Sequence, residues 1–202
     1  MNVPCDTEIG ALLLTRARAA IARRLGLALP SVPDAPWLHD KGACFVTLTQ
    51  DGSLRGCIGS LRPQRTLGED VDHNAVAAAF DDPRFPPLSA REYPLIRIEV
   101  SLLSVPEFLD IANENELIDQ LQPGRDGLIL FSGCRSATFL PQVWEQLPEP
   151  HRFVSALKQK AGLDPMRPTP NLMAATYTVR KWREACVGTD SSGAAVEHGA
   201  AR

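Results

Sequence analysis

One short segment combines a cysteine, an arginine and two glycines in an arrangement suited to thiol chemistry. It reads Leu54-Arg55-Gly56-Cys57-Ile58-Gly59-Ser60. If the segment is a strand, Arg55 and Cys57 lie on one face, about 7 Å apart. A guanidinium beside a cysteine favours the thiolate, the nucleophilic and metal-binding form. Cys57 is therefore a candidate nucleophile, and Arg55 is its candidate activating group.

The preceding residues predict a hairpin that positions this segment. Residues 43–49 alternate as a half-buried strand does, and Asp51-Gly52 is typical of a tight turn. The returning strand then places Leu54 and Ile58 on the face opposite Cys57.

The two glycines of the segment are unusual for a strand. Gly56 and Gly59 weaken a strand and usually mark either a bulge or a close approach by another backbone or a ligand, so both are candidate binding positions. A plain structural interpretation of Cys57 stays open beside the chemical one, because free cysteine is among the most buried residue types.

A second candidate group lies in the stiff loop that begins at Asp82-Pro83. Arg84 and Phe85 follow that proline and precede two more prolines. A guanidinium on a rigid loop suits bidentate binding of a carboxylate or phosphate, so Arg84 and Phe85 are candidate binding residues. The alternative is an internal salt bridge from Arg84 to Asp82 or Glu99.

Two further polar residues are weaker candidates. Glu99, on the polar face of a predicted strand, is a candidate general base or a partner for Arg55. Gln142 follows Pro141 at a strand end, where its amide either contacts a ligand or caps backbone groups. The four histidines have no metal-ligand spacing, so we predict no metal site.

The elements that position these residues mix hairpins and helices without regular βαβ alternation, which predicts an α+β fold with an antiparallel sheet. Thr7 is the expected cap of the first helix, and Thr66 and Glu69 match a capping box for the second. The predicted helices are 7–25, 67–80, 115–121 and 150–161, and the predicted strands are 43–49, 54–60, 96–102, 128–131, 137–140 and 171–184. Residues 185–202 are predicted to be a disordered tail.

Composition narrows the class of protein. The net charge of −3 argues against a nucleic-acid-binding domain, which usually carries a basic excess. Five cysteines without a Cys-x-x-Cys pair or a signal peptide indicate reduced thiols, and no apolar run is long enough to span a bilayer. We therefore expect a cytoplasmic protein, and the excess of arginine over lysine favours a bacterial source.

Six ordered blocks resemble the AMMECR domain family, named for a chromosomal region linked to Alport syndrome, intellectual disability, midface hypoplasia and elliptocytosis. They span a predicted domain of residues 7–184. The blocks are Leu54-Arg55-Gly56-Cys57-Ile58-Gly59, Asp82-Pro83-Arg84-Phe85, Glu99-Val100-Ser101, Gly124-Arg125-Asp126-Gly127, Leu140-Pro141-Gln142-Val143 and Lys160-Ala161-Gly162-Leu163. The chain departs from many relatives at residues 157–159, where they carry a second cysteine.

The resemblance implies two lobes, the larger from both chain ends and the smaller from the middle, with a cleft between them that gathers the signature residues. It also implies relatedness to protein A of the AmmeMemoRadiSam system, which accompanies a Memo-like protein and a radical SAM protein. Two functions stay open: a thiol-dependent enzyme acting on an anionic substrate through Cys57, or a non-catalytic module that binds a small molecule or partner. The cofactor is unknown.

Overall fold

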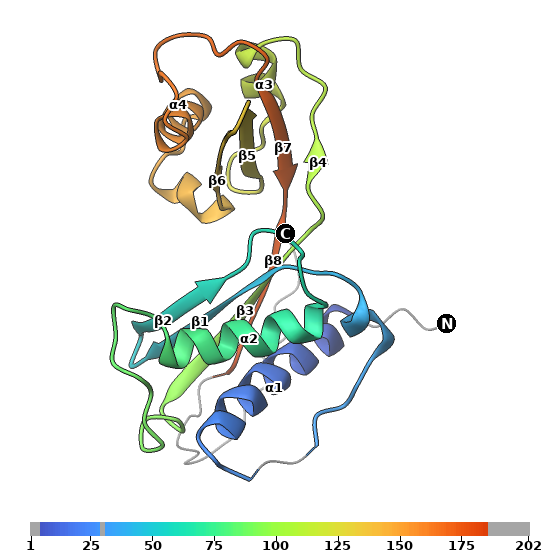
Figure 1. Cartoon of the computed structure of the whole chain (residues 1–202), viewed down its shortest axis with the longest axis vertical. Helices are drawn as coiled ribbons and strands as arrows, with labels where there is room; N and C mark the ends of the chain where they lie inside the picture. The colour runs from blue at the N-terminus through green and yellow to red at the C-terminus, as the bar shows by residue number, and fades with distance from the viewer. Residues whose placement is uncertain (1–4, 29–30, 186–202) are drawn as a thin grey trace, which may run out of the picture.

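The computed structural model describes residues 5–28 and 31–185, and it confirms the predicted α+β fold (Figure 1). Its α-helices are α1 (Asp6–Arg24), α2 (Leu67–Phe80), α3 (Glu114–Gln120) and α4 (Pro150–Lys160), and its 3-10 helices are η1 (Pro36–His39) and η2 (Pro141–Glu145). Its strands are β1 (Cys44–Gln50), β2 (Ser53–Gly59), β3 (Ile96–Leu103), β4 (Glu107–Phe108), β5 (Gly127–Ser132), β6 (Arg135–Phe139), β7 (Met173–Tyr177) and β8 (Val179–Arg183). The predicted tail lies outside the described residues except for Ala185.

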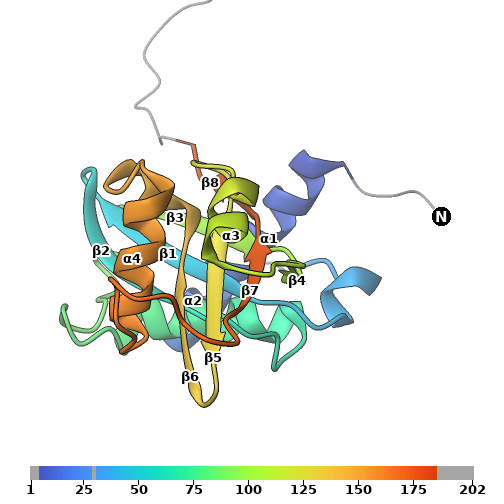
Figure 2. The ribbon, with the colours of Figure 1, turned by 90° about the horizontal axis from the view of Figure 1, so that it is seen from above.

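The strands form two antiparallel sheets, each with its own hydrophobic core. The first sheet has the order β2-β1-β3-β8, and α1 and α2 pack on one of its faces. The second has the order β4-β7-β5-β6, and its core includes residues of α3 and α4. Seen from above, the second group lies over the first (Figure 2). The first group contains both ends of the described chain, and the second contains its middle.

The chain crosses between the two sheets twice, once after β3 and once before β8 (Figure 1). The crossing segments are joined by hydrogen bonds: the Ser104 N–H donates to the Thr178 carbonyl (2.9 Å), and the Thr178 N–H donates to Ser104 Oγ (3.0 Å). The prediction of one strand over 171–184 is therefore wrong. Alternation continues through Thr178, but the partner strands change there.

Two helix starts test the predicted caps. The capping box of α2 is confirmed, since the Glu69 N–H donates to Thr66 Oγ1 (3.4 Å) and the Thr66 N–H donates to the Glu69 carboxylate (3.1 Å). For α1 the predicted cap, Thr7, is wrong. Cys5 is the N-cap, and its backbone N–H donates to the Glu8 carboxylate (2.9 Å).

Close packing of α2 on the first sheet explains one of the two glycines. A Cβ atom at Gly56 would lie 2.0 Å from the backbone oxygen of Ala78, on α2. Ala75 and Ala79 are buried on the same helix, and their small side chains let the helix backbone lie close to the sheet. The close approach predicted for Gly56 is confirmed, and the approaching group is a helix backbone.

Candidate functional site

Two candidate residues, Cys57 and Glu99, lie in one row across the first sheet, together with Thr47 and Arg183. Cys57 on β2 pairs with Thr47 on β1, which pairs with Glu99 on β3, which pairs with Arg183 on β8. Paired residues point to the same face of a sheet. Because Val46 and Leu48 of β1 point into the core with α1 and α2, this row lies on the opposite face.

The adjacent row explains the second glycine. Gly59, Phe45, Ser101 and Lys181 are paired in the same way across β2, β1, β3 and β8. A Cβ atom at Gly59 would lie 2.2 Å from the Phe45 ring, so the ring lies across the glycine. The close contact at Gly59 is thus made by a side chain of the same sheet.

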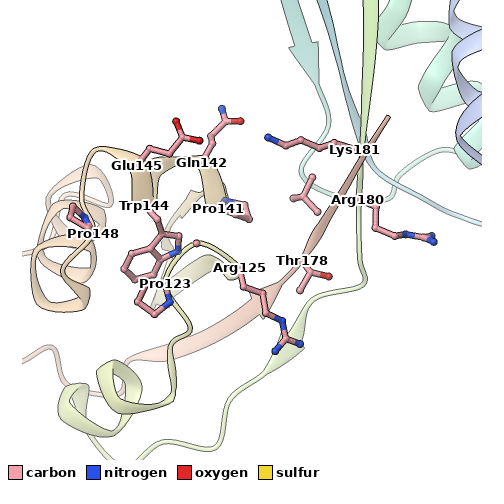
Figure 3. A pocket seen from close by; sticks show the side chains of 12 residues that line it. Pro123, Arg125, Pro141, Gln142, Trp144, Glu145, Pro148, Thr178, Arg180 and Lys181 are labelled. Carbon is pink, nitrogen blue, oxygen red and sulfur yellow. The ribbon is translucent and has the colours of Figure 1, made fainter. Parts of the chain in front are cut away.

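Three residues of each row line a cavity of about 150 Å³ between the two sheets. Its opposite wall is formed by Leu140, which joins β6 to η2, and by Pro141 and Gln142, the first two residues of η2. A larger groove of about 860 Å³ adjoins it and shares four lining residues with it: Pro141, Gln142, Val179 and Lys181. Figure 3 shows the side chains of Gln142 and Lys181 extending towards each other from opposite walls of this groove.

The thiol of Cys57 faces this cavity and is partly exposed. It lies 3.3 Å from the hydroxyl of Thr47, with which it shares a hydrogen bond. No histidine or carboxylate hydrogen-bonds to it among the described residues. The plain interpretation of Cys57 as a fully buried core residue is therefore wrong, whereas its role as a nucleophile stays a prediction.

Cys57 is held through its backbone by the loop that follows α2. Its N–H donates to Asp82 Oδ2 (2.9 Å), and its carbonyl accepts a hydrogen bond from the Arg84 guanidinium (3.3 Å). Since β2 is an edge strand, these groups would otherwise be open to pairing with another chain. The loop covers the edge strand at the candidate nucleophile, a function of Asp82 that we did not predict.

The alternatives for Arg84 are decided by the same contacts. Its Nε and one terminal nitrogen donate to the two oxygens of Asp82, at 2.9 Å and 2.7 Å. This hydrogen-bonded guanidinium, together with the Cys57 N–H, holds the pKa of the Asp82 carboxyl well below its ordinary value. The internal salt bridge to Asp82 is therefore confirmed. Arg84 is still about half exposed, so anion binding by its outer edge stays a prediction.

Arg55 does not lie where simple alternation places it. β2 carries a bulge there: Gly56 pairs with Leu48 and Leu54 pairs with Thr49, which leaves Arg55 without a partner residue. Leu54 therefore lies on the Cys57 face, and the expectation that it shares a face with Ile58 is wrong.

The Arg55 side chain is buried against the loop after α2. It makes no hydrogen bond to the Cys57 thiol, which it was predicted to activate. Its Nε donates to Glu92 (3.0 Å), and a terminal nitrogen donates to the Pro86 carbonyl (2.9 Å). Arg55, followed by the N–H and hydroxyl of Ser89, lowers the pKa of Glu92 to about 2. The Phe85 ring lies within 6 Å of both the Arg55 and Arg84 guanidinium groups. Arg55 and Phe85 thus brace the loop, and in the described structure the thiol's hydrogen-bond partner is Thr47.

Two charged residues line the cavity, one from each row: Glu99 and Lys181. The Glu99 carboxylate accepts a hydrogen bond from Arg183 Nε (2.9 Å), so its partner is Arg183 and not Arg55. In the described part of the chain, the Lys181 ammonium has neither a carboxylate partner nor a hydrogen bond. Sequence reasoning missed Lys181, although a lysine continuing the apolar face of residues 173–179 was a usable signal.

A buried polar cluster below the site serves a structural purpose. The Asp70 carboxylate accepts hydrogen bonds from the Cys44 N–H (3.0 Å), the Ser60 hydroxyl (2.7 Å) and the Asn74 amide (2.9 Å), which ties α2 to β1 and to the end of β2. Burial, and then the nearby Asp70 charge, raise the pKa of the Cys44 thiol strongly. Cys44 is therefore a core residue, as its alternation predicts.

The described residues contain neither a cluster of metal ligands nor a membrane-spanning helix. Residues 5–28 and 31–185 contain no group of three or more histidine, cysteine, aspartate or glutamate side chains placed to hold a metal ion. In the same residues, no helix has both the length and the apolar character needed to cross a membrane.

Comparison with known proteins identifies the family. The family model described as AMMECR1 matches residues 14–182. The chain belongs to the AMMECR1 family. Protein TV1384 of Thermoplasma volcanium is 39% identical over 166 residues, which cover 81% of this chain and 82% of that protein. Protein MK0488 of Methanopyrus kandleri is 39% identical over 175 residues, covering 82% and 83%.

The fold of this AMMECR1-family chain also matches a crystal structure, that of uncharacterized protein PH0010 from Pyrococcus horikoshii. The TM-score is 0.71 and the identity is 33%, over 87% of this chain and 91% of that one. These three AMMECR1-family relatives are archaeal, so a bacterial source stays a prediction.

Proposed function

We propose that this AMMECR1-family protein binds a small anionic molecule in the cleft between its two sheets, beside the Cys57 thiol. The observation that carries the proposal is the position of the Lys181 ammonium. It has no partner among the described residues, and it lines the same cavity as the thiol. The other charged residue of that cavity, Glu99, is neutralised by Arg183. The cavity therefore has an excess of positive charge at a point where a ligand can reach sulfur.

Polar groups without charge complete the proposed site. The hydroxyls of Thr47 and Ser101 and the amide of Gln142 line the cavity, and each can donate a hydrogen bond to an anionic oxygen. A ligand that enters through the larger groove passes between Gln142 and Lys181. By family resemblance, we propose that this activity is exercised together with a Memo-like protein and a radical SAM protein in the cytoplasm.

Two alkylating reagents of different charge test the anion site. Iodoacetate is anionic and iodoacetamide is neutral, and both alkylate thiols. We expect Lys181→Gln to lower the iodoacetate-to-iodoacetamide rate ratio at Cys57 by about threefold in low salt, because one positive charge is removed from the cavity that the thiol faces. The rates are measured by mass spectrometry of the peptide that contains Cys57.

The matched control is Lys181→Arg, which keeps the charge and is expected to keep the ratio. At about 1 M salt the difference between the Gln variant and the parent protein should largely vanish through screening. An unchanged ratio in Lys181→Gln at low salt would show that Lys181 does not attract anions to the thiol, and the proposal would fall.

A second candidate function is thiol-dependent catalysis, and one observation favours it. Among the cysteines of the described residues, Cys57 alone lines the cleft, whereas Cys44 is fully buried and Cys5 and Cys134 lie exposed elsewhere. In this function Cys57 is the nucleophile and Glu99 is its candidate base. Glu99 must then release Arg183 when substrate binds, because its carboxylate is engaged in the described structure.

Labelling order and stability together test whether Cys57 is a working thiol. We expect iodoacetamide to label Cys57 in the folded protein while Cys44 stays unmodified. We expect Cys57→Ser to change the melting temperature by less than about 3 °C, because the side chain is partly exposed and a hydroxyl can still bond to Thr47. Labelling only after unfolding, with a lower melting temperature in Cys57→Ser, would end the catalytic interpretation and leave binding in the cleft standing.

A further inference from the structure

The second sheet has one face covered by helices and one face that no helix of the described chain covers. Leu128 and Leu130 of β5 pack into the core with α3 and α4. Alternation places Ile129 and Phe131 on the other face. There Ile129 forms a row across the sheet with Phe108 on β4, Ala175 on β7 and Thr138 on β6.

This face has a hollow where a loop of the first group meets it. The hollow has a volume of about 480 Å³, and its wall includes residues 61–63, which follow β2. Two of the large apolar side chains that line it are exposed: Phe108 by 62% and Leu61 by 40%. A concave, mainly apolar site of roughly 300–1,000 Å³ is typical of small-molecule binding, and exposed apolar patches of this kind usually have a partner.

The charge at the rim selects the kind of ligand. Lys160 and Arg62 line the hollow, and no acidic residue of the described chain does. The Lys160 ammonium donates one hydrogen bond, to the Thr138 carbonyl (3.0 Å), which leaves two N–H groups available. Arg62 has no carboxylate partner among the described residues. The hydroxyls of Ser136 and Thr138 add neutral hydrogen-bonding groups.

We propose that this hollow binds a small molecule that has an apolar body and one anionic group. The body lies against Phe108 and Phe131, whose ring centroids are 5.7 Å apart, and the anionic group lies between Arg62 and Lys160. The hollow shares no lining residue with the cavity at Cys57, so this inference is independent of the proposed function. Its concave shape and its volume favour a small molecule over a flat protein surface.

A matched pair of probes tests both parts of the proposal. 2-Naphthoate and 2-naphthamide have the same ring system and nearly the same shape, but only the first is charged. We expect 2-naphthoate to bind with one site per chain and about threefold to tenfold more tightly than 2-naphthamide, as two exposed cations would give. Binding is measured by titration calorimetry on the full chain.

Two variants assign the binding to this hollow. Phe108→Ala removes an exposed ring and is expected to weaken both probes by about tenfold without unfolding the protein. Arg62→Gln is expected to reduce the preference for 2-naphthoate while leaving 2-naphthamide unchanged. The controls are Leu95→Ala, at an exposed leucine of the first group, and Arg152→Gln, at an exposed arginine of α4. Both variants should bind the two probes as the parent protein does.

Three results would overturn the proposal. Equal affinity for the two probes would remove the anionic requirement, and unchanged affinity in Phe108→Ala would place any binding elsewhere. A dimer in sedimentation that Phe108→Ala dissociates would show that a second copy of the chain occupies this face instead of a small molecule.

Discussion

Replacing Gly56 by valine is expected to destabilise the protein by more than about 3 kcal/mol, enough to prevent folding of a marginally stable domain. The Cβ atom would lie 2.0 Å from the Ala78 backbone oxygen, so α2 must move away from β2 as a whole. Because backbone cannot adapt as a flexible side chain does, the cost exceeds that of ordinary overpacking. Circular dichroism and urea unfolding of the purified variant measure it.

Two companion variants keep this prediction measurable if Gly56→Val does not fold. Gly56→Ala places the same Cβ atom against Ala78 and should also be clearly destabilised, though less than valine. Ile58→Val, two residues away on the core face, should cost only about 1 kcal/mol. Equal stability of Gly56→Ala and Ile58→Val would contradict the close approach of α2 to β2.

Replacing Asp82 by asparagine is expected to lower the free energy of unfolding by about 2 kcal/mol at pH 7. Asp82 is buried and accepts hydrogen bonds from the Cys57 N–H and from Arg84, so the change breaks an ion pair whose carboxylate is buried. We expect less than a fully buried pair would lose, because Arg84 is about half exposed and therefore screened. Urea unfolding of both proteins measures the difference.

The pH dependence of this effect has a defined sign. The pKa of Asp82 in the folded protein lies below its value in the unfolded chain, so the stabilisation is fully present above about pH 4. It is lost as the pH falls below the unfolded-state pKa and towards the folded-state value. The gap between the parent protein and Asp82→Asn should therefore be largest at about pH 5–7 and shrink at about pH 3 and below.

The control for this series is Asp81→Asn, at the exposed neighbouring residue, which is expected to change stability by less than about 0.5 kcal/mol. Asp82→Asn should also speed alkylation of Cys57, because the strand that carries the thiol loses its brace. A stability gap that is the same at about pH 3 and about pH 7 would mean that the Asp82 charge does not stabilise the fold.

Several local elements followed from short-range signals in the sequence. The hairpin of β1 and β2 was predicted from alternation and from Asp51-Gly52, and α2 from its capping box. The close approach at Gly56 was also predicted, because a glycine inside a strand usually marks a point where another group comes near the backbone. In each case the signal lies within a few residues of the feature that it predicts.

The bulge at Arg55 shows where alternation stops being reliable. A single unpaired residue in β2 puts Leu54 on the Cys57 face and frees Arg55 to bind Glu92 instead of serving the thiol. The glycines of this strand indicated a bulge or a close approach, but no local pattern placed the bulge at Arg55. Its position depends on how β2 pairs with β1 and on the loop that receives the guanidinium.

Local signals in the sequence were enough to predict the four α-helices, the first hairpin, the family and Cys57 as the centre of the candidate site. These depend on local periodicity, on capping and turn residues, and on motifs that are contiguous in the chain. The folded structure was needed to choose Asp82 over Glu99 as the partner of Arg84 and to show that Glu99 binds Arg183. It was also needed to show that Lys181 has no partner among the described residues. It also decided that residues 173–183 serve two sheets. Glu99 and Arg183 lie far apart in the chain, and strand register likewise joins distant residues, so no local signal predicts either one.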